Sequence, residues 1–138
     1  MSDNIKFLIA DDEQHIRNLL AIMVNSIGYE VVGQAEDGQQ AVDMYQSLKP
    51  DVLLLDINMP NMSGVDVLQH VIKANSSAVV IMLTSLNSLD VVRQCLGGGA
   101  KQYILKDNSI DNMREMLQEA ISKNIGLIAK NQMSNTDL

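Results

Sequence analysis

The sequence has few of the features that mark secreted, membrane-spanning or nucleic-acid-binding proteins. Its one cysteine, Cys95, cannot form an internal disulfide, and its apolar surroundings predict a buried thiol. The formal net charge is −7 without a basic cluster, so we expect no direct binding of nucleic acid. No apolar run approaches the ~20 residues of a membrane span, and residues 1–4 lack the pattern of a signal peptide. We therefore expect a cytoplasmic protein without membrane contact.

Short apolar runs alternate with amphipathic stretches five times along the 138 residues, a length that suits one domain. The expected strands are 6–10, 31–35, 52–55, 78–83 and 103–105. Helical faces lie over 16–27, 41–48, 65–74, 89–96 and 113–121, with Asp37 and Ser109 as possible helix caps. This alternation predicts an α/β fold in which helices cover both faces of a parallel sheet through right-handed crossovers.

Polar residues follow four of the expected strands at the point where each strand ends. They are Asp11 and Asp12, Asp56, Thr84 and Ser85, and Lys106. Ligands of open parallel sheets bind at the carboxyl ends of the strands. We therefore expect these carboxylates, hydroxyls and one ammonium group to converge at one edge of the sheet.

Carboxylates in one cleft repel each other, since two unit charges ~4 Å apart cost about 4 kcal/mol at an effective dielectric constant of about 20. Oxygen ligands without a nearby histidine or cysteine favour Mg²⁺, and Lys106 adds a further positive charge. A carboxylate beside a divalent ion and a lysine can act as a nucleophile toward phosphorus. We therefore predict that Asp56 accepts a phosphoryl group, whose oxygens take hydrogen bonds from Thr84 and Lys106.

Four segments resemble the receiver domain of bacterial two-component response regulators, across roughly residues 5–123. They are 10–13 (ADDE), 56–64 (DINMPNMSG), 84–85 (TS), and Gly99-Ala100 through Tyr103 to Lys106. The resemblance implies a flavodoxin-like, doubly wound (βα)5 sandwich of three layers with strand order 2-1-3-4-5. It also implies a receiver domain over residues 1–124. Residues 125–138 are then either a frayed tail or the start of a missing linker or output region.

The same resemblance implies the roles of the site residues. Asp56 accepts phosphate from a sensor histidine kinase, a phosphotransfer protein or a small phosphodonor, in a reaction that needs Mg²⁺, for which Mn²⁺ can substitute. The implied metal ligands are Asp11 (mainly through water), Asp12, Asp56 and the backbone carbonyl of Asn58. Thr84 moves to contact the phosphoryl group, Tyr103 follows as a rotating aromatic ring, and Lys106 pairs with the phosphoryl oxygens. The signal leaves through the face of the fourth helix, fifth strand and fifth helix.

Two positions depart from the pattern of the family. Asp107 follows Lys106, where many receivers carry a proline in a cis bond, so the geometry of this peptide bond stays open. Leu86 lies two residues after Thr84, where some receivers carry a polar residue. Leu86 and Asn58 would border the path of an attacking water, so we expect an apolar Leu86 to slow hydrolysis of the acyl phosphate.

Several readings of the function stay open beside a switch that catalyses only its own phosphorylation and dephosphorylation. A phosphatase or phosphotransferase of the haloacid dehalogenase type also uses a strand-end aspartate and Mg²⁺. That family has a second acid two residues after its nucleophile, where this chain has Asn58. A receiver-like protein that binds partners without phosphorylation is a further reading. The chain acts either alone on a downstream protein or as the receiver fragment of a DNA-binding regulator, as a monomer or a phosphorylation-dependent dimer.

Overall fold

The computed structural model describes residues 4–136, in which strands and helices alternate up to residue 123 and a further helix follows. The strands are β1 (Lys6–Ala10), β2 (Glu30–Ala35), β3 (Val52–Leu55), β4 (Val80–Thr84) and β5 (Gln102–Leu105). The helices are α1 (Gln14–Ile27), α2 (Gly38–Leu48), α3 (Gly64–Ala74), α4 (Leu89–Gly97), α5 (Ile110–Lys123) and α6 (Ile125–Thr136). The strands form one parallel sheet with the order β2-β1-β3-β4-β5. The predicted fold class and strand order are confirmed.

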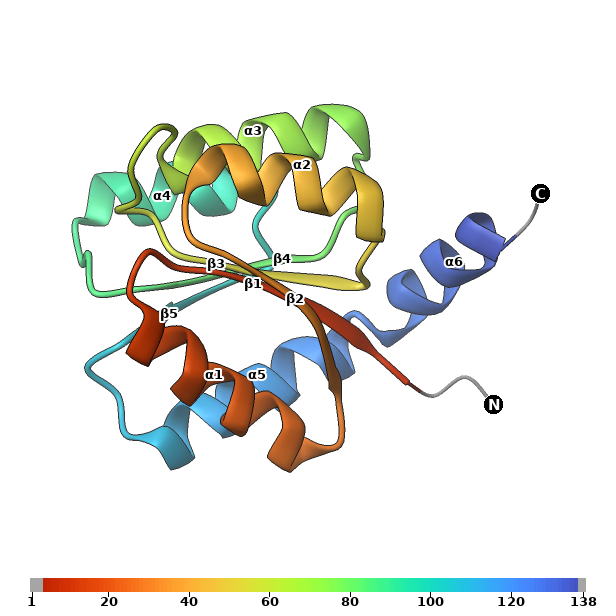
Figure 1. Cartoon of the computed structure of the whole chain (residues 1–138), viewed down its shortest axis with the longest axis horizontal. Helices are drawn as coiled ribbons and strands as arrows, with labels where there is room; N and C mark the ends of the chain where they lie inside the picture. Colours follow the sequence, from red (N-terminus) through yellow and green to blue (C-terminus); the bar gives the residue numbers. More distant parts are fainter. Residues whose placement is uncertain (1–3, 137–138) are drawn as a thin grey trace.

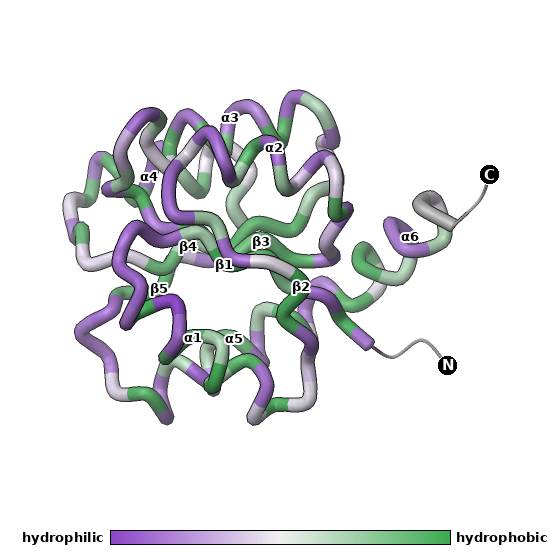
Figure 2. Tube along the Cα trace, viewed as in Figure 1, coloured by the Kyte–Doolittle hydropathy of each residue, from purple (hydrophilic) through white to green (hydrophobic). Residues whose placement is uncertain are grey.

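Helices cover both faces of the sheet, which gives the molecule three layers. Figure 1 shows α2, α3 and α4 on one face, and α1 and α5 on the other. Phe7 and Ile9 of β1 belong to the core with α1 and α5, while Leu8 and Ala10 belong to the core with α2, α3 and α4. Every residue of β3 and β4 is buried, so these strands read as unbroken apolar runs. Figure 2 shows this hydrophobic centre and the mixed colouring of the helices around it.

The ends of three helices match the turn and cap residues of the sequence. Gly28 ends α1 with a φ of 106°, in the left-handed region that glycine adopts without strain. Asp37 caps α2 by accepting a hydrogen bond from the Gln40 N–H, and Ser109 caps α5 by accepting one from the Asn112 N–H. These caps fix where α2 and α5 begin, and both helices begin close to the carboxyl edge of the sheet.

The fourth strand is shifted relative to the predicted range 78–83. The Ala78 N–H donates to the Asn75 carbonyl in the turn after α3, so the strand begins only at Val80. It continues one residue further than predicted and ends on Thr84 itself. Thr84 is therefore held by the sheet.

Residues 125–136 form helix α6, so the expectation of a frayed tail is wrong for this part of the chain. Ile128 is 1% exposed and belongs to the core with α1 and α5. Two side-chain hydrogen bonds also hold α6, from Asn131 to the Ser77 carbonyl (2.8 Å) and from Gln132 to the Asp51 carboxylate (3.2 Å). That residues 125–138 lead into a missing linker or output region stays a prediction. Residues 137–138 lie outside the described residues. None of the helices within residues 4–136 is long and apolar enough to span a membrane.

Candidate functional site

Asp11 and Asp56 are the first residues after β1 and β3, two strands that lie side by side in the sheet. The Asp56 N–H donates to the Ala10 carbonyl over 2.9 Å, and the Asp11 N–H donates to the Ala35 carbonyl over 3.0 Å. Both hydrogen bonds continue the pairing of the strands beyond their last residues. The sheet therefore fixes the backbone of both aspartates at its carboxyl edge.

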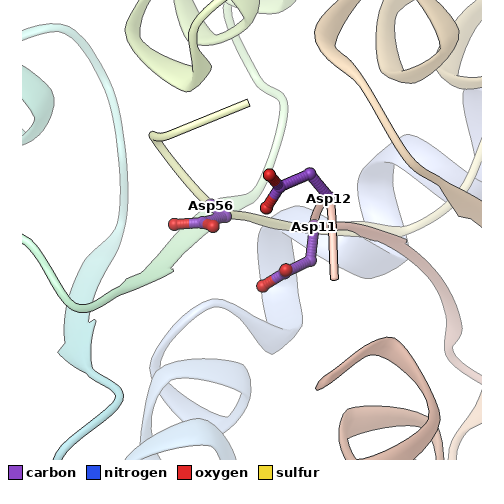
Figure 3. A group of neighbouring side chains, drawn as sticks. All are labelled: Asp11, Asp12 and Asp56. Carbon is purple, nitrogen blue, oxygen red and sulfur yellow. The ribbon is translucent and has the colours of Figure 1, made fainter. Parts of the chain in front are cut away.

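Asp11, Asp12 and Asp56 form one cluster, which we call the acid trio (Figure 3). Each of the three carboxylates has an oxygen within 4.8 Å of the others. Asp11 is 0% exposed and Asp56 is 5% exposed, whereas Asp12 is exposed. The acid trio is therefore open to solvent beside Asp12 and closed beneath the other two.

Backbone N–H groups hold two of these carboxylates in place. Asp56 Oδ1 accepts a hydrogen bond from the Ile57 N–H (2.8 Å), and Asp11 Oδ1 accepts one from the Glu13 N–H (2.9 Å). Arg17 Nη1 donates to the Asp11 carbonyl over 2.8 Å, and Arg17 is only 9% exposed. We did not predict a role for Arg17, although an arginine within the apolar face of an expected helix was a signal for it.

Lys106 reaches the acid trio from the end of β5. Its Nζ lies 2.6 Å from Asp11 Oδ2 and 3.1 Å from Asp56 Oδ2. Burial lowers the pKa of Lys106, but the contact with Asp11 and the charges of Asp56 and Asp11 outweigh it, so the pKa is raised overall. The ammonium group is therefore charged at neutral pH and compensates two buried carboxylates at once.

The negative charge of Asp11 is compensated less completely than the positive charge of Lys106. Burial raises the pKa of Asp11, and its contacts with Lys106 and the Glu13 N–H only partly oppose this, so the pKa is raised overall. Asp11 Oδ2 is buried and has no partner with hydrogen-bond geometry, which makes its contact with Lys106 an ion pair. A further cation beside the acid trio would relieve this burial of negative charge. Carboxylate oxygens are ligands that Mg²⁺ prefers, so the residues present fit the expected ion.

Thr84 and Tyr103 both contact the same residue of the loop after β4. Thr84 is 0% exposed, and its Oγ1 accepts a long hydrogen bond of 3.4 Å from the Leu86 N–H. The Tyr103 hydroxyl donates to the Leu86 carbonyl over 2.6 Å. The Lys106 N–H donates to the Thr84 carbonyl over 2.9 Å, which joins β4 to the end of β5. Leu86 therefore links Thr84 to Tyr103.

Within residues 4–136, two further predicted residues, Asn58 and Asp107, form no hydrogen bond or ion pair with the acid trio. Asn58 is exposed in the loop between β3 and α3, and its role as a metal ligand stays a prediction. Asp107 is exposed as well. Residues 4–136 contain no cis peptide bond, so the bond between Lys106 and Asp107 is trans.

We predict that Asp11→Asn stabilises the metal-free protein at neutral pH and weakens its stabilisation by Mg²⁺. A carboxyl whose folded pKa is raised favours the folded state while it is protonated, and this contribution is lost as the pH rises through the folded pKa. The neutral amide avoids that loss, so the free energy of unfolding of Asp11→Asn should exceed that of the wild type at pH 7 and approach it at lower pH. Urea unfolding with and without MgCl₂ measures both effects.

Asp66→Asn, which changes an exposed carboxylate of α3, is the control for the loss of one negative charge. A metal-free Asp11→Asn variant that is less stable than the wild type at pH 7 would contradict the prediction.

The sequence matches the response regulator receiver domain family over residues 7–118. It is 36% identical over 116 residues to the chemotaxis protein CheY of Listeria monocytogenes, which covers 84% of this chain and 98% of that protein. It is also 36% identical over 101 residues to CheY of Thermotoga maritima, covering 73% of this chain and 84% of that protein. The solved CheX–CheY–BeF₃–Mg²⁺ complex of Borrelia burgdorferi contains a similar chain, with a TM-score of 0.79, 32% identity, and coverage of 86% of this chain and 87% of that one. The chain described here belongs to the response regulator receiver domain family.

Proposed function

We propose that Asp56 accepts a phosphoryl group and that the protein is a phosphorylation-controlled switch of two-component signalling. The observation that carries this proposal is the position of Lys106 Nζ, between Asp56 Oδ2 (3.1 Å) and Asp11 Oδ2 (2.6 Å) at the acid trio. A lysine placed there can stay in contact with the negative charge at Asp56 when that side chain is phosphorylated. Membership of the receiver family supports the proposal.

In the proposed reaction, a carboxylate oxygen of Asp56 attacks the phosphorus of a phosphohistidine on a sensor histidine kinase or phosphotransfer protein. A P–O bond to Asp56 forms while the P–N bond breaks, and the histidine nitrogen keeps the electron pair. Lys106 then donates to a phosphoryl oxygen instead of the Asp56 carboxylate, so its positive charge stays compensated. The hydrogen bond from the Ile57 N–H to Asp56 Oδ1 (2.8 Å) orients the carboxylate and leaves Oδ2 for the attack.

The residues that would hold the metal ion are Asp11, Asp12, Asp56 and the Asn58 carbonyl. Mg²⁺, or Mn²⁺ in its place, supplies charge neutralisation for the transferring oxygens when it is bound. The fit rests on three carboxylates whose ligand atoms lie within 4.8 Å of one another, and on the solvent-open side of the acid trio at Asp12. The solved CheY complex of Borrelia burgdorferi, which contains Mg²⁺ and BeF₃, supports this proposal.

The proposed switch runs from Thr84 to the face of α4, β5 and α5. Shifting a two-state equilibrium from 1:99 to 99:1 needs about 5.5 kcal/mol, and hydrogen bonds from Thr84 and Lys106 to a charged group give about 1.5–3 kcal/mol each. If Thr84 turns toward the phosphoryl group, its 3.4 Å bond with the Leu86 N–H breaks, and the partner of the Tyr103 hydroxyl moves. Leu89 and Leu96 of α4 are 61% and 44% exposed, which offers apolar area to a downstream protein.

The alternative of a haloacid-dehalogenase-like enzyme is disfavoured, because that family places its nucleophile after the first strand and Asp56 follows the third. Asn58 also stands where that family has a second acid. Within the switch function, the downstream partner is either a separate protein or an output domain of a longer chain. We expect no direct contact with nucleic acid or membrane, and either a monomer or a dimer that depends on phosphorylation.

Asp56→Asn should abolish phosphorylation, because the amide lacks the nucleophilic carboxylate. Incubation of the wild type with acetyl phosphate and Mg²⁺, followed by intact-protein mass spectrometry, should show one phosphoryl group per chain. EDTA should prevent the labelling, and the control Asp66→Asn should be labelled like the wild type. Repeated turnover of a generic aryl phosphate would instead support the phosphatase alternative and sink the receiver proposal.

Thr84→Ala should still accept the phosphoryl group on Asp56 but fail to transmit it, because the hydroxyl that contacts the phosphoryl oxygens is missing. Amide hydrogen exchange of the β4–α4 loop and α4, with and without acetyl phosphate, measures the response. Thr84→Ser keeps the hydroxyl and is the matched control. An unchanged phosphorylation response in Thr84→Ala would show that the coupling does not pass through this hydroxyl.

Leu86→Glu should speed hydrolysis of the acyl phosphate, because a carboxylate at this position can orient an attacking water that an apolar side chain cannot. The measurement is the decay of phosphorylated protein after removal of the phosphodonor. Leu86→Met keeps an apolar side chain and should decay at the wild-type rate. Equal decay rates for Leu86→Glu and wild type would remove Leu86 as a tuning residue.

A further inference from the structure

The loop between β3 and α3, residues 57–63, begins directly after Asp56, and we call it the acceptor loop. The Gly64 N–H donates to the Ile57 carbonyl (2.8 Å), and the Met62 N–H donates to the Pro60 carbonyl (2.8 Å). A Cβ atom at Gly64 would overlap the Asp56 carbonyl oxygen, so the end of the loop packs directly against the peptide of the acceptor. A displacement of the acceptor loop would therefore move Asp56 or its neighbours.

The turn between β2 and α2 holds the acceptor loop from outside, where the two segments meet (Figure 1). Asn61 Nδ2 donates to Asp37 Oδ2 over 3.0 Å, and the Gly38 N–H donates to the Pro60 carbonyl over 3.4 Å. A Cβ atom at Gly38 would overlap the Met62 carbonyl oxygen, so only glycine permits this approach of the two backbones. We call the Asp37–Asn61 contact the clamp.

Each side chain of the clamp has a second task that fixes its position. Asp37 caps α2, because its Oδ1 accepts from the Gln40 N–H over 2.8 Å while Oδ2 accepts from Asn61. Asn61 has a φ of 69°, in the left-handed region that asparagine adopts more readily than most residues. One carboxylate therefore joins the start of α2 to the middle of the acceptor loop, so the loop conformation does not depend on its own turns alone.

We propose that Asp37 and Asn61 are positioning residues for Mg²⁺ binding and for phosphoryl transfer to Asp56. They act by holding the acceptor loop, which begins directly after Asp56 and carries the proposed ligand Asn58, in one conformation. The inference rests on the proposed function of Asp56 and extends it to a residue pair outside the acid trio. Without the clamp, the loop samples more conformations, so part of the binding free energy is used to order it.

The test uses two variants of the full chain that each remove one side of the clamp. Asn61→Gly permits the left-handed backbone and removes the amide, and Asp37→Ser keeps a helix-capping oxygen and removes the second carboxylate oxygen. Isothermal titration calorimetry gives the Kd for Mg²⁺, and labelling with acetyl phosphate gives the phosphorylation rate. Each variant should weaken Mg²⁺ binding about two- to tenfold, the range that the loss of one hydrogen bond corresponds to. The double variant should be no weaker than the single ones, because the two residues act as one unit.

Controls separate the clamp from changes of charge or stability. Asp43→Ser removes another exposed carboxylate of α2 that does not contact the acceptor loop, and it should bind Mg²⁺ like the wild type. The proposal would be overturned if only Asp37→Ser changed the Kd or the labelling rate. It would also be overturned if both variants were less thermally stable than the wild type but kept its Kd and labelling rate. If the wild type takes no label, the proposed function fails, and the Mg²⁺ titrations still decide on the clamp.

Discussion

Two carboxylates buried next to each other are the constraint on which the rest of this site depends. Asp11 and Asp56 are almost inaccessible to solvent, and the sheet leaves them no freedom to separate. Their repulsion is offset by one ammonium group, that of Lys106, which contacts both. Burial is the main cause of the raised pKa of Asp11, and the contact with Lys106 only partly opposes it. The acid trio has three carboxylates against this one ammonium group, an excess of negative charge that suits a divalent cation.

The strand order decides which side chains lie beside these two carboxylates. Lys106 follows β5 while Asp56 follows β3, so the lysine reaches the carboxylate past the end of β4. Thr84 is the last residue of β4, and its carbonyl accepts from the Lys106 N–H. A change of charge on Asp56 would therefore act on the side chain of Lys106. The Thr84 hydroxyl lies on the strand between these two residues. The order of the parallel strands thus places the Asp56 carboxylate, the Thr84 hydroxyl and the Lys106 ammonium group at neighbouring strand ends.

The sequence was sufficient for the parts of the molecule that depend on local patterns. Apolar runs ending on Asp56, Thr84 and Lys106 predicted both the strands and the site at their ends, because side chains after parallel strands meet at one edge. Helix α6 escaped prediction, since most of its segment is polar and hydrogen bonds to Asp51 and Ser77 help to hold it. The contacts of Arg17 with the Asp11 carbonyl and of Asn61 with Asp37 also escaped, because no periodicity shows which distant group a polar side chain will bond to.

The hydrogen bonds around the acid trio are unequal on its two sides, and on the proposed function this inequality would set the direction in which a signal travels. On the side of β1, Asp11 is held through its N–H, its Oδ1 and its carbonyl, by bonds of 2.8–3.0 Å. On the side of β4, Thr84 Oγ1 has only a 3.4 Å bond to the loop that it would have to leave. On the proposed function, a phosphoryl group on Asp56 would displace the weaker side first. The loop after β4, and with it the partner of Tyr103, would move while β1 and α1 stay in place.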